Sequence, residues 1–172
     1  MSRVAEIENN HRQMVSGLVK DGGDIADDLN GSPTEHRSLM NVVRNMIEAG
    51  LQLDNIKKQT IYNKNLGLRY SGGQIPDPIE ADQAHLLHMA IGIVGEASEL
   101  LEAVVNHIDG ERLDIENVVE ELGDIEFYME GFRNGVAMTR TTTLAQNYAK
   151  LGKRYEGFTY SDQAATDRAD KA

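Results

Sequence analysis

Two neighbouring stretches of this chain combine a helical apolar pattern with paired acids, and they constrain the fold more than any other feature. Glu96 and Glu99 lie three positions apart in the first stretch, and Glu121 and Asp124 lie three apart in the second. Residues at this spacing share one face of a helix, so each pair of carboxylates converges. If the two helices pack antiparallel, four acids meet. Burying them ionised and without partners costs on the order of several kcal/mol.

The rest of the chain also follows helical periodicity. No window alternates between apolar and polar residues as a strand does. Ser32 and Glu35 predict a capping box with Pro33 at the first helical position, and Asp77 and Glu80 repeat this start signal. The expected helices cover residues 3–20, 32–62, 77–108, 115–133 and 141–154.

This pattern predicts an all-α protein, in the form of an antiparallel four-helix bundle with an extra N-terminal helix. We expect residues 1–31 to form the N-terminal helix followed by an acidic, glycine-bearing linker. Residues 32–160 are expected to form the bundle domain, and residues 161–172 a loose polar tail.

The apolar positions of the two acid-bearing helices predict which faces pack in the core. The expected core stripes are Leu86, Ala90, Ile93, Ala97, Leu100, Leu101, Val104 and Ile108 on the first helix, and Val118, Leu122, Ile125, Met129 and Phe132 on the second. Glu121 lies at the edge of its stripe, whereas Glu120 points toward water. Glu96 and Glu99 share a face with Gly92, where a small residue lets another helix or a ligand approach. Glu121 is therefore exceptional among these acids, because it is expected to lie beside the core.

Composition limits the partners that such a chain can have. The net charge of −11 repels nucleic-acid backbones and anionic membranes, so we expect neither as a partner. The chain has no Cys, which excludes disulfides, thiolate zinc sites and cysteine nucleophiles. No apolar run approaches the length of a membrane span, and the first residues are too polar for a secretory signal. We expect a cytoplasmic protein.

A buried group of acids is stable in two ways, by protonation or by binding cations. A di-iron bundle would require Glu-x-x-His on two of its helices, and that motif does not occur here. A site built only from oxygen ligands suits Mg²⁺, with Mn²⁺ as a possible substitute. A single E-x-x-E is usually a solvated helix face, but an E-x-x-D on the next helix makes chance a poorer explanation.

At these residues the chain resembles the MazG-like superfamily of all-α nucleoside triphosphate pyrophosphohydrolases, including small members carried by bacteriophages. The resemblance rests on "HMAIGIVGEASELLEAV" followed by "VVEELGDIEFYM", and it is specific over residues 86–133. It implies that Glu96, Glu99, Glu121 and Asp124 are the metal ligands and catalytic acids. It also implies a Mg²⁺-dependent hydrolase that cleaves nucleoside or deoxynucleoside triphosphates to monophosphate and pyrophosphate, and that acts as a homodimer or homotetramer.

The resemblance extends loosely to "NYAKLGKRYEGFT" near the C-terminus. Asn147, Lys150, Arg154 and Tyr155 resemble the family's nucleotide-binding residues, although the same spacing also fits a solvated helix face. Weaker candidates for gripping phosphates or the nucleoside are Lys57, Lys58, Lys64 and Tyr128, and His88 is a weak candidate ligand.

Two alternatives remain open from the sequence. One is a hydrolase of an alarmone or another nucleotide signal. The other is a non-catalytic bundle that binds nucleotides or is merely structural, and a structural bundle would gain no stability from Mg²⁺.

Overall fold

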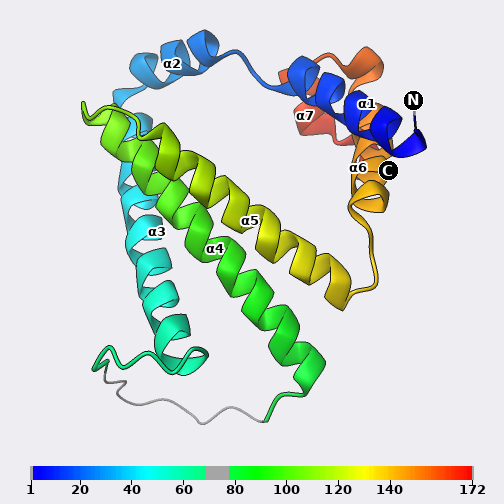
Figure 1. Cartoon of the computed structure of the whole chain (residues 1–172). Coiled ribbons are helices and arrows are strands. Elements are labelled where there is room, and N and C mark those ends of the chain that lie inside the picture. Colours follow the sequence, from blue (N-terminus) through cyan, green and yellow to red (C-terminus); the bar gives the residue numbers. More distant parts are fainter. Residues whose placement is uncertain (1, 69–77, 172) are drawn as a thin grey trace. The chain divides into compact units, whose positions relative to one another are not determined.

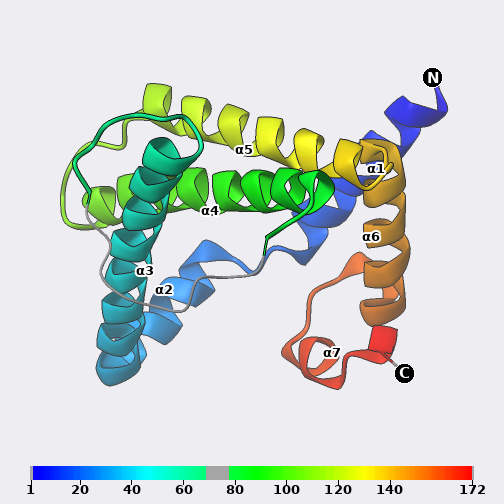
Figure 2. The ribbon, with the colours of Figure 1, turned by 90° about the horizontal axis from the view of Figure 1, so that it is seen from below.

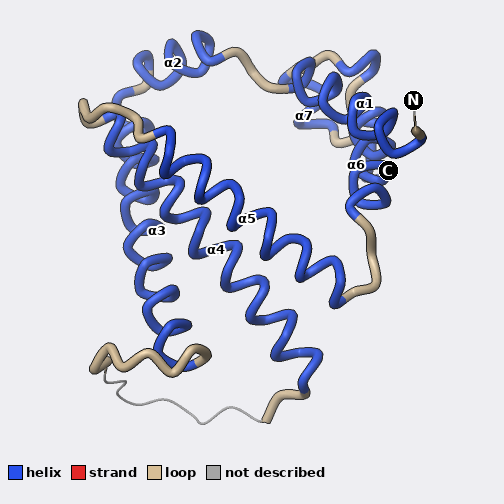
Figure 3. Tube along the Cα trace, viewed as in Figure 1, coloured by secondary structure: helices blue, strands red, loops and turns tan. Residues whose placement is uncertain are grey.

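The computed structural model describes residues 2–68 and 78–171, and every regular element within these ranges is helical (Figure 3). The expected all-α class is confirmed. The elements, labelled in Figure 1, are α1 (Arg3–Leu18), α2 (Gly22–Gly31), α3 (Pro33–Thr60), α4 (Ala81–Ile108), α5 (Ile115–Gly135), α6 (Arg140–Arg154) and α7 (Asp162–Asp167), with two short 3₁₀ turns, η1 (Glu156–Phe158) and η2 (Ala169–Lys171). Among the described helices, none has the length and apolar character needed to cross a membrane.

The chain divides into two compact units. Unit 1 comprises Met1–His36 and Met138–Ala172, and unit 2 comprises Arg37–Ala137. This division differs from the expected boundaries, because α6 belongs to the unit that contains α1 and not to the unit that contains α4 and α5. Unit 2 thus contains three of the four helices expected for the bundle.

In unit 2, α4 and α5 form a long antiparallel pair, and α3 crosses them (Figures 1 and 2). Glycines permit the close approach of the three helices. A Cβ atom at Gly92 of α4 would lie 2.2 Å from Cδ1 of Tyr128 on α5, and one at Gly50 of α3 would lie 1.8 Å from Oγ of Ser98 on α4. The small residue that the sequence placed beside the acids on α4 therefore serves helix packing.

The buried faces of α4 and α5 differ from the predicted apolar stripes. The buried residues are Met89, Gly92, Gly95, Ser98 and Val105 on α4, and Glu121, Tyr128 and Arg133 on α5. Leu122 and Val104, both assigned to the core from the sequence, are 49% and 41% exposed. The prediction was wrong for them and for Ile108, which is 59% exposed, whereas other residues of the predicted stripes, such as Ile93, Leu100 and Ile125, are half-buried.

The start of α4 also differs from the prediction. The helix begins at Ala81, where the backbone N–H of Glu80 donates to the Oε1 atom of Gln83 over 2.9 Å. This is one half of a capping box, formed three residues later than the sequence suggested. The predicted cap, Asp77, lies outside the described residues.

In unit 1, α1 packs against α6, and Met14 of α1 is only 2% exposed. Two expectations for this unit were wrong. The segment assigned as a linker is helix α2, because the Asp21 side chain accepts hydrogen bonds from the N–H groups of Gly23 and Asp24 and caps it. The tail assigned as loose forms α7 and η2, and Asp170 makes a bidentate ion pair with Arg154.

Candidate functional site

Three acids from the two motif helices converge in unit 2. One carboxylate oxygen from each of Glu96, Glu99 and Glu121 lies within 4.8 Å of the other two. Glu96 and Glu99 share a face of α4, and the antiparallel packing of α5 brings Glu121 against them. Glu121 is 5% exposed, and the Glu96 side chain is 12% exposed. We call these three residues the acidic triad.

The fourth motif acid, Asp124, lies apart from the triad. It is exposed to solvent, and it is not one of the acids whose oxygens converge. Its charge still acts on the site, since repulsion from Asp124 is one of the smaller causes that raise the pKa of Glu121. The structure thus assembles three of the four predicted ligands.

The triad holds more negative charge than its surroundings stabilise. Burial, followed by repulsion from Glu99 and Glu96, raises the pKa of Glu121 from 4.5 to about 7. Burial, followed by repulsion from Glu96, also raises the pKa of Glu99. Both shifts show that removing a proton from this group of carboxylates is unfavourable without an added positive charge.

Helix α3 supplies a pair of buried charges beside the triad. Lys57 is 2% exposed and Asp54 is 4% exposed. The Nζ atom of Lys57 lies 2.8 Å from Oδ1 of Asp54 and 3.5 Å from Oε1 of Glu96. Lys58 also pairs with Asp54, but its side chain is 39% exposed. The Asp54 carboxylate therefore sits between two ammonium groups, one buried and one near the surface.

The charge on Lys57 is stabilised despite its burial. Burial by itself would lower the pKa of this lysine, but the hydrogen bonds to Asp54 and to the Tyr128 hydroxyl outweigh that effect and raise it. The same two ammonium groups lower the pKa of Asp54 against its own burial. Lys57 and Asp54 are therefore both charged at neutral pH.

Sequence reasoning did not identify Asp54, and it ranked Lys57 only as a weak candidate. One signal was present, because Asp54 precedes Lys57 by three residues and Lys58 by four, a spacing that places all three on one helix face. The same spacing is common on solvated helices. Only the crossing of α3 over α4 reveals that this face is buried.

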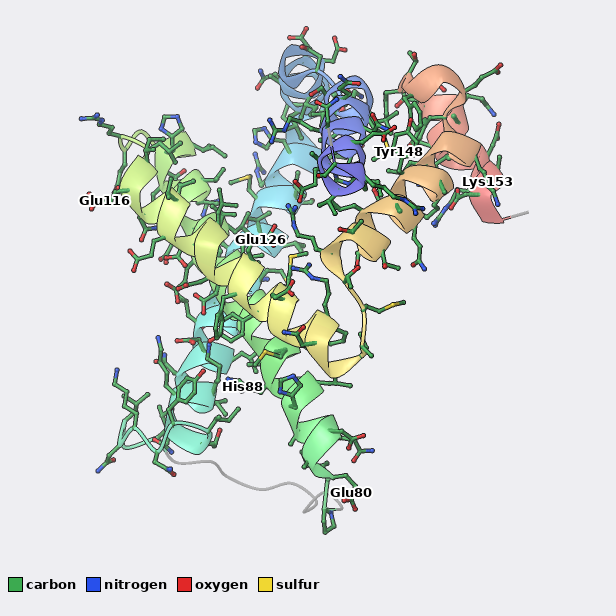
Figure 4. All side chains as sticks on the ribbon, turned by 45° about the vertical axis from the view of Figure 1, so that its right-hand side comes forward. Glu80, His88, Glu116, Glu126, Tyr148 and Lys153 are labelled. Atoms are coloured by element: carbon green, nitrogen blue, oxygen red, sulfur yellow. The ribbon has the colours of Figure 1, made fainter. Side chains whose placement is uncertain are left out.

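A hydrogen-bonded group of aromatic residues continues from Lys57 toward the surface. The Lys57 ammonium donates to the Tyr128 hydroxyl over 3.3 Å, and the Tyr62 hydroxyl lies 3.3 Å from that of Tyr128. The Tyr62 hydroxyl also lies 2.7 Å from Nε2 of His88, which projects from α4 (Figure 4). Burial, with repulsion from Lys57, lowers the pKa of His88. His88 thus bonds to a tyrosine and does not belong to the acidic triad.

The donor set of the triad fits a hard divalent cation. Three carboxylates supply oxygen ligands, as Mg²⁺ and Mn²⁺ prefer, and no described His shares the cluster. Counting Asp54 with the triad gives four negative charges, and Lys57 and Lys58 offset two of them. The remaining charge of −2 equals the charge that one divalent ion would neutralise.

A pocket of about 270 Å³ opens beside one member of the triad, where α4 ends and α5 begins. It is lined by Glu99, Glu102, Asn106, Arg112, Asp114 and Asn117, among others. Arg112 supplies a guanidinium to an otherwise acidic and amide-lined surface. The pocket therefore offers an anionic ligand one cation next to a carboxylate of the triad.

The four residues predicted to bind the nucleotide lie in unit 1, on α6 and directly after it. Lys150 is exposed and Asn147 is half-buried. Tyr155 is 7% exposed, and the Arg154 guanidinium pairs with Asp170, which raises the pKa of the arginine. Of these four side chains, Lys150 is the most open to a ligand.

Protein-family models, curated proteins and solved structures were compared with this chain, and none of them matches it. The functional interpretation therefore depends on the motif and on the geometry of the triad.

Proposed function

We propose that this protein is a Mg²⁺-dependent nucleotide pyrophosphohydrolase of the MazG-like type, which converts nucleoside or deoxynucleoside triphosphates to monophosphate and pyrophosphate. The observation that carries the proposal is the convergence of Glu96, Glu99 and Glu121 within 4.8 Å in a largely buried position. The sequence motif predicts such a convergence, but the acids meet only if the two helices pack with their acidic faces together. A solvated pair of helix faces would have left these acids apart.

In this proposal the triad holds the metal. The motif suggests Asp124, which lies on the next turn of α5, as a further ligand. When bound, the ion neutralises charge on phosphate oxygens and lowers the pKa of a water molecule. The protein residues have other tasks. Glu121 and Glu96 present their carboxylates from a largely buried position, covered by neighbouring side chains. Lys57 places a fixed positive charge against Glu96.

The substrate approaches from the side of Glu99, where the pocket with Arg112 opens. Arg112 is suited to a phosphate, because a guanidinium offers several donors in one plane. Asn106 and Asn117 offer amide groups to the sugar or base. Lys150, on α6 of unit 1, is exposed and stays a predicted nucleotide-binding residue.

The proposal includes self-association, by which a second copy covers the apolar face of the α4–α5 pair and completes a bundle. Large apolar side chains remain exposed on this pair of helices, including Val119 at 64% and Leu122 at 49% on one face of α5, and Val94 at 42% on α4. Of these residues, Leu122 belongs to a stripe that the sequence assigned to a core. A homodimer would bury them and would supply the missing helices of a four-helix bundle.

The test is pyrophosphate release from a panel of canonical and modified nucleoside triphosphates and diphosphate-containing nucleotide signals, with Mg²⁺ or Mn²⁺. We expect at least one substrate to be cleaved, and we expect Glu121→Gln to lower the rate by a factor of about a hundred or more. Glu120→Gln is the matched control, because Glu120 is the preceding residue of α5 and is exposed. An intact panel with both metals would reject the enzymatic function for these substrates.

The position of Asp124 favours one second candidate, a protein that binds cations and nucleotides without turnover. An exposed Asp124 leaves three converging ligands instead of four. Calorimetry decides between the two functions: heat of nucleotide binding without any released pyrophosphate supports the binding protein, whereas turnover that depends on Asp124 supports the hydrolase.

A further inference from the structure

Lys57 is the most deeply buried charged side chain beside the acidic triad, and α3 holds it there from outside the two motif helices. It is 2% exposed, its ammonium lies 2.8 Å from Asp54 and 3.5 Å from Glu96, and it donates to the Tyr128 hydroxyl. The ammonium also lies 5.0 Å from the centre of the Tyr128 ring. These contacts fix its position on several sides.

The partners of Asp54 indicate that this lysine does more than neutralise one aspartate. Asp54 already pairs with Lys58, so two ammonium groups share a single carboxylate on α3. One positive charge is therefore in excess on this helix. Lys57 is the buried lysine of the two, and it also contacts Glu96. Its positive charge therefore acts on the triad.

We propose that Lys57 is a resident cation of the acidic triad, placed by α3 against Glu96 so that the centre takes up one divalent ion and binds it less tightly than the triad alone would. This inference rests on the metal site of the proposed function. Lys57 acts by its charge at a fixed distance, and it is a positioning residue because it contacts a ligand and not the substrate.

Replacing a lysine that acts by its charge changes the Mn²⁺ affinity in the opposite direction from replacing a lysine that only supports packing. Removing a buried positive charge close to the triad strengthens the attraction for Mn²⁺, because interactions in a partly desolvated site are weakly screened. Removing a lysine whose only role is packing would loosen the site and weaken Mn²⁺ binding. The direction of the change in affinity therefore separates the two roles.

The experiment is a Mn²⁺ titration of the full chain without nucleotide, followed by electron paramagnetic resonance of the free ion. The wild-type protein is expected to bind one Mn²⁺ per chain. Lys57→Met is expected to bind the first Mn²⁺ about tenfold more tightly or better. Lys58→Met is a graded comparison: its ammonium also pairs with Asp54 and acts on Glu99, but its side chain is 39% exposed, so the affinity should rise by a smaller factor than in Lys57→Met. Arg44→Met is the control expected to leave the affinity unchanged, because the Arg44 guanidinium is 48% exposed and pairs with Asp109.

Asp54→Asn provides a second measurement of opposite sign, which serves if Lys57→Met does not fold. It removes a negative charge and leaves both lysines near the triad, so Mn²⁺ binding should weaken by about tenfold. Circular dichroism of each variant establishes that it is folded. Unchanged or weaker binding in folded Lys57→Met, or unchanged or tighter binding in Asp54→Asn, overturns the proposal.

The outcomes also separate this inference from the proposed function. If the wild-type protein binds no Mn²⁺, the metal site fails and the resident cation fails with it. If the wild-type protein binds Mn²⁺ and the Lys57 and Asp54 variants do not shift in the stated directions, only the resident cation is refuted.

Discussion

Replacing Glu121 with Gln should stabilise the metal-free protein at alkaline pH, although it removes a proposed metal ligand. The pKa of Glu121 in the folded protein is raised from 4.5 to about 7 by burial and by its neighbours Glu99 and Glu96. A raised pKa means that the protonated carboxyl favours folding. Its stabilising contribution is complete below about pH 4.5, declines as the pH rises, and is lost above about pH 7.

The magnitude follows from the size of the shift. At about 1.4 kcal/mol for each pH unit, the rise from 4.5 to about 7 corresponds to about 3.5 kcal/mol. Solvent screening at the open side of the triad reduces this value, and we expect about 2 kcal/mol to be measured. Glutamine has nearly the shape of a protonated glutamate, so Glu121→Gln should keep this stabilisation at every pH. In a chain of 172 residues it should raise the Tm by about 4 to 8 °C.

The assay is thermal unfolding in a metal chelator at pH 5 and pH 8.5, for the wild-type protein, Glu121→Gln and the exposed control Glu120→Gln. The Tm difference between Glu121→Gln and the wild-type protein should be small at pH 5 and largest at pH 8.5. Glu120→Gln should follow the wild-type protein at both values. A Glu121→Gln variant that is less stable than wild type at pH 8.5 would refute the reasoning, because it would show that the ionised carboxylate is satisfied within the protein.

Three further predictions test other parts of the structure. Adding Mg²⁺ at about a hundred times its Kd should stabilise the wild-type protein by about 2.7 kcal/mol and leave Glu121→Gln nearly unchanged, which a thermal melt would measure. Gly92→Ala should destabilise the protein by about 1 to 3 kcal/mol because its Cβ would clash with the Tyr128 ring, whereas Gly123→Ala, which meets no atom within 4 Å, should stabilise it by up to about 1 kcal/mol in urea unfolding. Leu122→Ser should shift the protein toward the monomer in light scattering, because Leu122 is 49% exposed on the face proposed to meet a second copy.

The sequence predicted α1, α3, α4, α5 and α6 and the position of Glu121 beside the core, because these depend on local patterns, but it missed α2 and α7. Helix α4 ends at Ile108, α5 begins at Ile115 and α6 ends at Arg154, in agreement with the caps and the apolar spacing. The burial of Glu121 agrees with its place beside an apolar stripe. Helical periodicity determines such relations within one helix, and no knowledge of neighbouring helices is required.

The contribution of α3 was not predictable in the same way. Asp54 and Lys57 have the spacing of an ordinary surface ion pair, and their burial depends on the angle at which α3 crosses α4. Gly50 of α3 indicates how that crossing is made possible, because a Cβ atom there would overlap the side chain of Ser98 on α4. A pattern of small residues on α4 shows that some helix approaches, but it does not identify which helix or which of its faces.

Exposed positions of the aliphatic stripes of α4 and α5, such as Val104, Ile108 and Leu122, were misassigned for a related reason. A helix that is apolar on one face and carries small or acidic residues on another has two faces able to be buried, and one sequence cannot rank them. In the single chain the face with Gly92, Glu121 and Tyr128 is buried, and the aliphatic face with Leu122 is exposed. Both faces would be buried if a second copy covers the aliphatic one. A measurement of the oligomeric state therefore decides the question. In a monomer the exposed aliphatic positions were wrongly assigned to a core, whereas in a dimer that covers them the assignment was right.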